Sequence, residues 1–283
     1  YIPLAVCVPY WVAAEKGFYR DEGLNVTLIR FPATGSGLTE ALAAGSLDIG
    51  YVAFATAAMA FDKGIDIRMA TDGGHTDQDH EGAFIVVGKD SGILSVKDLK
   101  GKNLGLPGWG GLPEAVERYL LRKHNLTMAD VNVVLIPGER ALESLIASRI
   151  DAAYLGEPYL TYAMNTGNFT KLCPTVGSFF PDHRFQGGVA IFLREFLNQH
   201  KDTVDAFIRA QQKAIQWMDS HPDETRAIIA NYTGLDIQIV KNMQLYAYSL
   251  QPDLELINRC LNLLKEEGLI SRTIRADEIM YIP

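Results

Sequence analysis

The sequence predicts an α/β protein of two lobes, and three observations lead to this fold class. Short runs rich in β-branched residues alternate with segments of helical spacing as far as residue 193, which is the pattern of a mostly parallel sheet with helical crossovers. The alternation starts again after a polar loop at residues 72–81. Two glycine-led apolar runs, behind Gly82 and behind Gly188, stand at the edges of the middle section, as a chain that crosses twice between lobes requires.

In the first section, glycines end the helical patterns and apolar or β-branched runs follow them. Gly23, Gly45 and Gly64 are such helix ends. The predicted strands are residues 1–8, 25–29, 47–51 and 66–70, and the predicted helices are residues 10–19, 38–44 and 56–62.

The middle section repeats this order of elements. Pro113 stands where proline is tolerated, in the first turn of a helix. The predicted strands are residues 83–87, 103–106, 131–136 and 151–155, and the predicted helices are residues 95–99, 113–124 and 140–147.

The last section begins with a glycine- and proline-containing loop at 176–188 and a return strand at 189–193. Helices then follow at residues 194–200, 203–220, 222–231, 236–246 and 253–267. We expect lobe 1 to comprise residues 1–82 and 189–283, and lobe 2 to comprise residues 83–188.

Composition excludes several classes of protein. The 283 residues are 48% hydrophobic and 21% charged, which is enough for a large core. A net charge of -8 without a clustered basic face argues against nucleic acid as a partner. The three cysteines have no CxxC spacing, which argues against a zinc ribbon or a disulfide framework. The chain does not begin with Met, so the lack of a signal peptide carries no information on export.

Specific strings in the first 162 residues add a family to this pattern. Residues 17–19 and 22–24 read GFY-x-x-EGL. The other matching segments, in the family's order, are Pro9 with 12–16, 40–45 with Asp48, 90–93, 98–102, 141–142 with 151–153, and Glu157 with Pro158. With these strings the sequence resembles the periplasmic substrate-binding proteins of the nitrate, sulfonate, taurine and thiamine-pyrimidine type, which serve ABC importers.

The resemblance implies a type II two-lobed binding-protein fold with two crossover strands and a helical C-terminal tail. It implies that the lobes close by a hinge on a small-molecule ligand in the interlobe cleft, and that an ABC transporter permease is the partner. We expect a monomer in the periplasm, or anchored outside a membrane, that binds no nucleic acid, needs no cofactor and is not an enzyme. The expected ligand is a small organic anion: a sulfonate, an aromatic or heterocyclic acid, or a pyrimidine-type molecule.

Candidate binding residues stand directly behind the β runs, because ligands of open α/β sheets bind beyond the carboxyl ends of the strands. They are Cys7, Pro9, Tyr10, Trp11, Gly35, Ser36, Phe54, Thr56, His75, Trp109, Gly110, Gly111, Arg140, Glu157 and Gly187.

Two of these groups favour an anionic ligand. Gly35 with Ser36, and Gly110 with Gly111, precede helices whose backbone N–H groups attract anions, although such glycines also serve simply as helix caps. Arg140 suits a carboxylate, and a surface ion pair is the alternative for it.

The aromatic candidates favour a flat ring. Tyr10, Trp11, Phe54 and Trp109 could stack on one, and packing at a hinge or rim is the alternative. Binders of sulfonate or nitrate in this family usually have Ser or Thr in the loop where this sequence has Trp109 and two glycines, which counts against a small oxyanion.

Cys7 is the basis of an alternative function, an enzyme on the same fold of the desulfinase or pyrimidine-synthase kind. A thiolate at Cys7 with His75 nearby would form a nucleophile and base. Buried cysteine more often acts as a small hydrophobic residue, and the cysteine-rich motif of the pyrimidine synthases is absent. A sensory ligand-binding domain is a third possibility.

One run has a metal-like composition. His75, Asp77, Asp79 and His80 could converge on an ion. A solvated polar loop is the favoured interpretation, so we predict no metal site.

Overall fold

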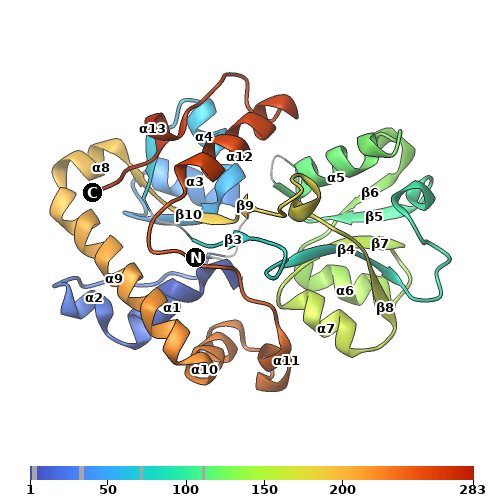
Figure 1. The fold of residues 1–283 in the computed structure, drawn as a ribbon, viewed down its shortest axis with the longest axis horizontal. Coiled ribbons are helices and arrows are strands. Elements are labelled where there is room, and N and C mark those ends of the chain that lie inside the picture. Colours follow the sequence, from blue (N-terminus) through green and yellow to red (C-terminus); the bar gives the residue numbers. More distant parts are fainter. Residues whose placement is uncertain (2–4, 32–34, 71–72, 110–111) are drawn as a thin grey trace. The chain divides into compact units, whose positions relative to one another are not determined.

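The computed structural model describes residues 1, 5–31, 35–70, 73–109 and 112–283. The chain forms two compact units. Unit 1 comprises Tyr1–His75, Gln186–Lys241 and Tyr246–Pro283, and unit 2 comprises Thr76–Phe185 and Asn242–Leu245. The chain leaves unit 1 through strand β3 (His75–Thr76) and returns through strand β9 (Phe185–Gln186), and these two strands pair. The labels of Figure 1 identify the elements of each unit.

Unit 1 is built on a three-stranded sheet with the order β1-β10-β2. The strands are β1 (Gly50–Ala53), β2 (Ile67–Met69) and the return strand β10 (Gly188–Leu193). β10 lies between the other two and is antiparallel to both. The prediction of a mostly parallel sheet is therefore wrong for this unit, because the return strand enters between two strands of the opposite direction.

Helices enclose this sheet. α3 and α4 pack on its strands, α12 packs on α4, and α9 packs on α1. The helices of unit 1 are α1 (Val8–Glu15), α2 (Phe18–Asp21), α3 (Gly35–Ala43), α4 (Phe54–Asp62), α8 (Arg194–Gln199), α9 (Lys201–Ser220), α10 (Pro222–Thr233), α11 (Ile237–Asn242), α12 (Leu254–Glu266) and α13 (Ala276–Ile279). No helix in the described part of the chain is both long and apolar enough to cross a bilayer.

The predicted strand at residues 1–8 is wrong for residues 5–8, and residues 2–4 lie outside the described part of the chain. Ala5–Cys7 form a 3₁₀ turn and Val8 begins α1, with Pro9 in the first turn, where its missing N–H costs nothing. An apolar run that is buried on all sides has no period that separates a strand from a helix. The predicted strand at 25–29 has no ladder either. The amino group of Tyr1 donates to Ile29 O at 2.7 Å, and Phe31 N donates to Tyr1 O at 2.8 Å.

Unit 2 is built on a five-stranded mixed sheet with the order β6-β5-β7-β4-β8. β5 is parallel to β6 and β7, whereas β4 is antiparallel to β7 and β8. The strands are β4 (Ala83–Gly88), β5 (Asn103–Leu106), β6 (Asn132–Leu135), β7 (Ala152–Gly156) and β8 (Phe169–Pro174). β5 has the predicted bounds. β8 was not predicted, because an edge strand with exposed Thr170 and Lys171 lacks the apolar run that marks a buried one.

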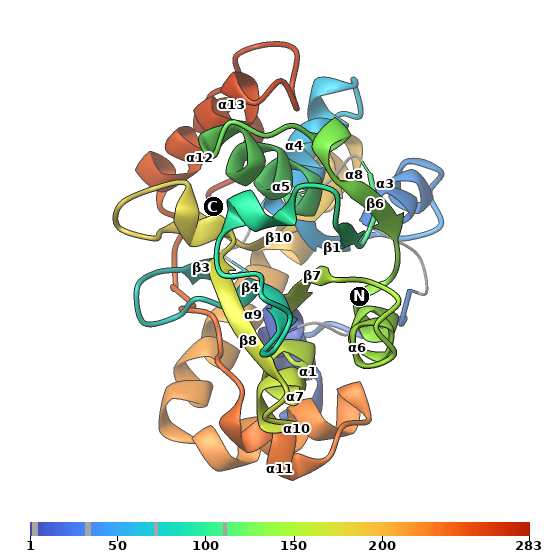
Figure 2. The same ribbon diagram turned by 90° about the vertical axis from the view of Figure 1, so that its right-hand side faces the viewer.

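The helices of unit 2 are α5 (Leu112–Lys123), α6 (Gly138–Ile146) and α7 (Tyr159–Asn165). Figures 1 and 2 show α5 on one face of the sheet and α6 and α7 on the other. 3₁₀ turns lie at Val96–Leu99, Met128–Asp130 and Val176–Ser178. The predicted helix at 95–99 is such a turn, which Ser95 and Asp98 close as a capping box.

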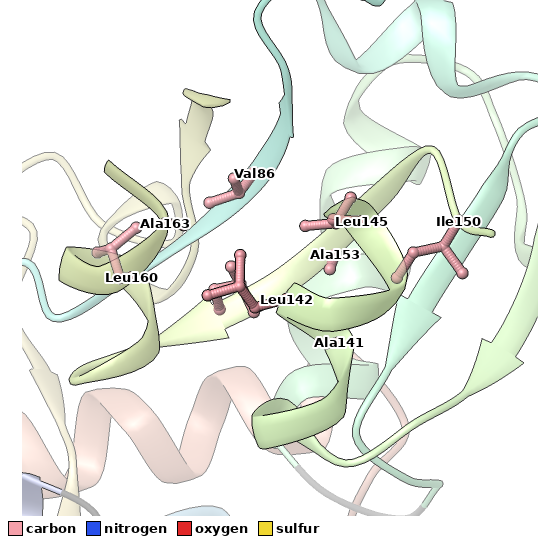
Figure 3. Packing of buried hydrophobic residues seen from close by; sticks show 9 residues of the cluster. Val86, Ala141, Leu142, Leu145, Ile150, Ala153, Leu160 and Ala163 are labelled. Carbon is pink, nitrogen blue, oxygen red and sulfur yellow. The ribbon is translucent and has the colours of Figure 1, made fainter. Parts of the chain in front are cut away.

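The core beneath α6 follows from the spacing of its apolar residues. Ala141, Leu142 and Leu145 lie on one face of the helix and pack against Val86 of β4 and Ala153 of β7. Figure 3 shows these side chains together with Leu160 and Ala163 of α7. All members of the cluster are less than 9% exposed. This packing gives unit 2 a hydrophobic core of its own.

Leu142→Ala tests the contribution of this core. The substitution leaves a cavity beneath α6, and we expect the free energy of unfolding to fall by about 2–5 kcal/mol. Leu94→Ala is the control, because Leu94 is 85% exposed and should change the value by less than about 0.5 kcal/mol. Urea unfolding followed by circular dichroism measures both. Equal effects of the two substitutions would contradict the assignment of the core.

Candidate functional site

Four glycines join the strand ends of unit 1. Phe54 N, at the end of β1, donates to Gly187 O at 3.0 Å. Gly187 N donates to Gly74 O at 2.8 Å, and Gly73 N donates to Gly188 O at 3.0 Å. We call Gly73, Gly74, Gly187 and Gly188 the glycine junction. It brings the segments behind β1 and β2 together with the start of β10, at the sheet edge where α/β proteins bind ligands.

A tyrosine explains why two of these positions are glycine. Tyr51 Oη donates to Gly73 O at 2.9 Å. A Cβ atom on Gly188 would stand 2.0 Å from Tyr51 Oη, and one on Gly73 would stand 2.1 Å from it. The ring of Tyr51 also packs against the ring of Tyr10, with ring centroids 4.3 Å apart. The phenol of Tyr51 therefore leaves no room for a side chain at either glycine.

Gln186 fixes the junction from the side of β9. Its side chain is buried, and Nε2 donates to Gly74 O at 3.2 Å and to Gly188 O at 3.1 Å. Gln186 is not among the candidates from the sequence, because glutamine one position before a glycine pair gives no local signal of burial.

Two tyrosines missed by the sequence analysis also lie at the junction. Tyr246 and Tyr248 contact the position where a Cβ on Gly74 would stand, and Tyr248 Oη donates to Ala5 O at 2.7 Å. The sequence predicts a helix at residues 236–246, which would end at Tyr246, but α11 stops at Asn242. The spacing of the two tyrosines by two residues, which is the extended period, was the available signal.

Most candidates near the first helix are core residues. Cys7 is 1% exposed, Tyr10 4%, and Trp11 and Phe54 0%, and Pro9 is also buried. The Trp11 ring stacks on the ring of Tyr232, with centroids 5.2 Å apart and planes at 10°. The structure thus gives these rings a packing role, and their role in ligand binding stays a prediction.

The remaining candidates of unit 1 lie on α3, on α4 and on the crossover segments. Thr56, on α4, and Gly187 are half-buried. Gly35 and Ser36 open α3. His75 is half-buried on β3, and its backbone pairs with Ala247.

In unit 2, Trp109 is 50% exposed behind β5, and Gly110 and Gly111 lie outside the described residues. Arg140 is exposed in the first turn of α6. It borders a surface hollow lined by Leu135, Ile136, Pro137, Arg140, Glu143, Ser144 and Arg149. A second hollow, in unit 1, lies between α9 and residues 249–252 and 281–283, and no sequence candidate lines it.

Glu157 is a buried carboxyl with protein partners. Its Oε1 accepts from Thr161 Oγ1 at 2.9 Å and from Gln244 N at 3.2 Å, and Oε2 accepts from Thr161 N at 3.1 Å. Burial raises the pKa of Glu157, and the hydrogen bonds from Thr161 and Gln244 offset part of that rise. The side chain caps the start of α7 and joins the segment Asn242–Leu245 to the rest of unit 2, so the structure gives it a structural role.

The metal-like run does not gather its ligands. His80 Nδ1 lies 2.7 Å from Asp77 Oδ1. Burial raises the pKa of Asp77, but hydrogen bonds from His80 and Asp79 outweigh it and the net pKa is lowered. Within residues 73–109 and the rest of the described chain, no group of three or more His, Cys, Asp or Glu side chains could hold a metal ion.

Gly188→Ala tests the glycine junction. The new methyl group overlaps Tyr51 Oη, and we expect a loss of about 1–3 kcal/mol in the free energy of unfolding. The loss should be smaller in a Tyr51→Phe background, because the phenol oxygen is then absent. Gly108→Ala is the control, since nothing lies within 4 Å of a Cβ there. Strict additivity of Gly188→Ala and Tyr51→Phe in a double-mutant cycle would contradict the steric explanation.

Glu157→Ala tests the capping role. It removes the acceptor for three donors, and we expect a loss of about 1–3 kcal/mol in the free energy of unfolding. Glu143→Ala, at an exposed position of α6, is the control. Chemical denaturation measures both variants, and equal stabilities would show that the three hydrogen bonds contribute nothing measurable.

Two known proteins are similar to this chain in sequence over most of its length. A protein of Bacillus subtilis (strain 168), provisionally named an aliphatic sulfonates-binding protein, is 28% identical over 240 residues, which cover 83% of this chain and 69% of that protein. The 4-amino-5-hydroxymethyl-2-methylpyrimidine phosphate synthase of Candida albicans (strain WO-1) is 25% identical over 261 residues, which cover 85% of this chain and 73% of the synthase.

The fold is also that of a solved structure. The periplasmic aliphatic sulphonate binding protein SsuA from Escherichia coli superposes with a TM-score of 0.79 at 17% identity, over 100% of this chain and 91% of that one. The expected two-lobed α/β binding-protein fold is confirmed. The family model described as NMT1/THI5 like matches residues 5–225. The chain therefore belongs to the NMT1/THI5-like family.

Proposed function

We propose that this protein is the extracytoplasmic solute-binding component of an ABC importer and that it binds a small organic anion. The observation that carries the proposal is the similarity, over most of the chain, to a protein named for binding aliphatic sulfonates. The ligand class includes sulfonates, aromatic or heterocyclic acids and pyrimidine-type molecules. A membrane permease is the partner, and the protein acts as a monomer.

The way the chain links its two units supports a receptor that works by hinge motion. The crossover strands β3 and β9 pair with each other, so motion of one is transmitted to the other. In unit 1 their ends are fixed by the glycine junction and by Gln186. Each unit has its own sheet and can move as a body. Closure of the units on the ligand is part of this proposal.

The preference for an anion is supported by α6. Its N-cap residue is Pro137, whose side chain does not cap the helix. The N–H of Arg140 donates to Pro137 O at 2.9 Å, so a ligand oxygen would meet the N–H groups that precede it. Arg140 stands in the first turn and is exposed. A guanidinium group binds a carboxylate or sulfonate through two parallel hydrogen bonds.

The enzyme alternative finds less support. Cys7 is 1% exposed and ends a buried 3₁₀ turn ahead of α1, whereas a nucleophile needs access to its substrate. One relative, the pyrimidine phosphate synthase, is an enzyme. Turnover is therefore measured alongside binding.

A ligand screen tests the function. Purified protein is heated with alkanesulfonates, aromatic carboxylates, pyrimidines, flavins, nitrate and bicarbonate, and hits are confirmed by calorimetry. A ligand at about 100 times its dissociation constant should stabilise the protein by about 2.7 kcal/mol. We expect a shift with one organic anion class and no consumption of that compound.

Two outcomes contradict the proposal. Consumption of the compound, lost in Cys7→Ala, would identify an enzyme, and a response limited to uncharged molecules would exclude an anion receptor. Arg140→Ala should weaken anion binding about tenfold or more. Arg275→Ala, at an exposed ion pair with Asp277, is the matched control and should leave the affinity unchanged.

A further inference from the structure

A buried carboxyl group joins two loops inside unit 2. Glu81, which lies between β3 and β4, is 9% exposed. Its Oε1 accepts a hydrogen bond from Gly177 N at 3.3 Å, and its Oε2 lies 3.4 Å from His183 Nδ1. Gly177 and His183 belong to the loop that leads into β9. The contact therefore ties the segment that enters unit 2 to the segment that leaves it.

The loop around Glu81 is shaped for this contact. A Cβ atom on Gly177 would stand 1.8 Å from Glu81 Oε2 and 2.8 Å from His183 Nδ1, so only glycine fits there. His183 has a φ of +56°, a left-handed conformation that few non-glycine residues adopt. Its carbonyl oxygen accepts from Thr76 Oγ1 at 2.7 Å, and that hydroxyl accepts from Phe185 N at 3.1 Å. Residues of β3 and β9 thus fix the backbone of His183.

One oxygen of Glu81 is unsatisfied. Among the residues that the structure describes, no group donates a hydrogen bond to Oε2. A buried carboxylate oxygen without a donor is costly, whereas a protonated oxygen there would itself be a donor. The nearest ring nitrogen, His183 Nδ1, lies 3.4 Å away and makes no hydrogen bond to it. This geometry favours a proton on the Glu81 carboxyl group.

The groups around Glu81 do not stabilise its charged form enough to offset burial. Burial raises the pKa of Glu81 to about 7, and the hydrogen bond from Gly177 and the charge of Lys171 offset part of the rise. Lys171, on β8, lies with Nζ over the ring of Phe84, 4.4 Å from its centroid. Cys173 on β8 and Tyr154 on β7 also face Glu81, and burial raises the pKa of both, that of Cys173 to about 12.

We propose that Glu81, Gly177 and His183 form a proton-operated clamp, which holds the loop at 176–184 while the Glu81 carboxyl carries a proton and loosens when that proton is lost. Loss of the proton leaves a buried negative charge that accepts one hydrogen bond, from Gly177 N, and has no donor at Oε2 among the described residues. The clamp lies next to the crossover strands β3 and β9 in the chain. The degree to which these strands and the loop before β9 are ordered therefore depends on pH near neutrality. This property does not depend on which ligand the protein binds.

The sign of the pH effect follows from linkage. The pKa of Glu81 is raised on folding from 4.5 to about 7, so the folded state holds the proton more tightly than the unfolded chain. Its contribution to stability is complete below pH 4.5 and is lost as the pH rises through 7. Glu117 and Glu157, whose pKa values burial also raises, add effects of the same sign, so the comparison must be made between variants.

Amide hydrogen exchange of the full chain without ligand tests the clamp. We expect the protection of the loop at 176–184, corrected for the intrinsic rate, to fall by up to tenfold per pH unit between pH 4.5 and 7 and to level off above 7. In Glu81→Gln, which cannot ionise at this position, the fall between pH 5 and 8 should be clearly smaller. Glu143→Gln, at an exposed position of α6, should behave as the unmodified protein does.

A second measurement keeps the test valid should Glu81→Gln fail to fold. The ¹³C shift of the Glu81 carboxyl carbon is followed by NMR in the unmodified protein from pH 4 to 9. A midpoint near 7 supports the clamp, and a midpoint near 4.5 overturns it. Equal loss of loop protection with pH in Glu81→Gln and in the unmodified protein would also overturn it.

Discussion

The insertion of β10 between β1 and β2 is the constraint on which unit 1 depends. This strand comes from a part of the chain more than 100 residues away from its neighbours, and it is buried over nearly its whole length. Its start must pass between the hydroxyl of Tyr51 and the backbone of the segment behind β2, where no side chain fits. The return of the chain to its first sheet thus requires glycine at the glycine junction. The same residues fix the ends of both crossover strands in unit 1.

The sequence contained enough local information for most elements but not for their pairing. Helix ends at Gly23, Gly45 and Gly64 could be predicted because each has a positive φ, which glycine alone adopts freely. The direction of β10 could not, since it depends on strands distant in the chain. Residues 5–8 were misjudged because burial on all sides removes the periodicity that distinguishes a helix from a strand.

The candidate site was less predictable than the fold, and the reason is burial. Trp11 and Phe54 are aromatic residues of the kind that could stack on a ligand ring, yet both are completely buried. Glu81 and Glu117 look like ordinary surface acids in the sequence and are buried. Which acid is buried depends on neighbours such as Gly177, nearly 100 residues further along. The sequence can nominate residue types behind strands, but it does not reveal which side chains solvent reaches.

The order of strands has a consequence for synthesis of the chain on the ribosome. All five strands of unit 2 have been made once Pro174 is added. The central strand of unit 1 ends only at Leu193, so its sheet cannot close earlier, although its first residues are made first. The inner segment of the chain can therefore reach its native sheet while the N-terminal segment still waits for its partner, which reverses the usual N-to-C order of domain folding.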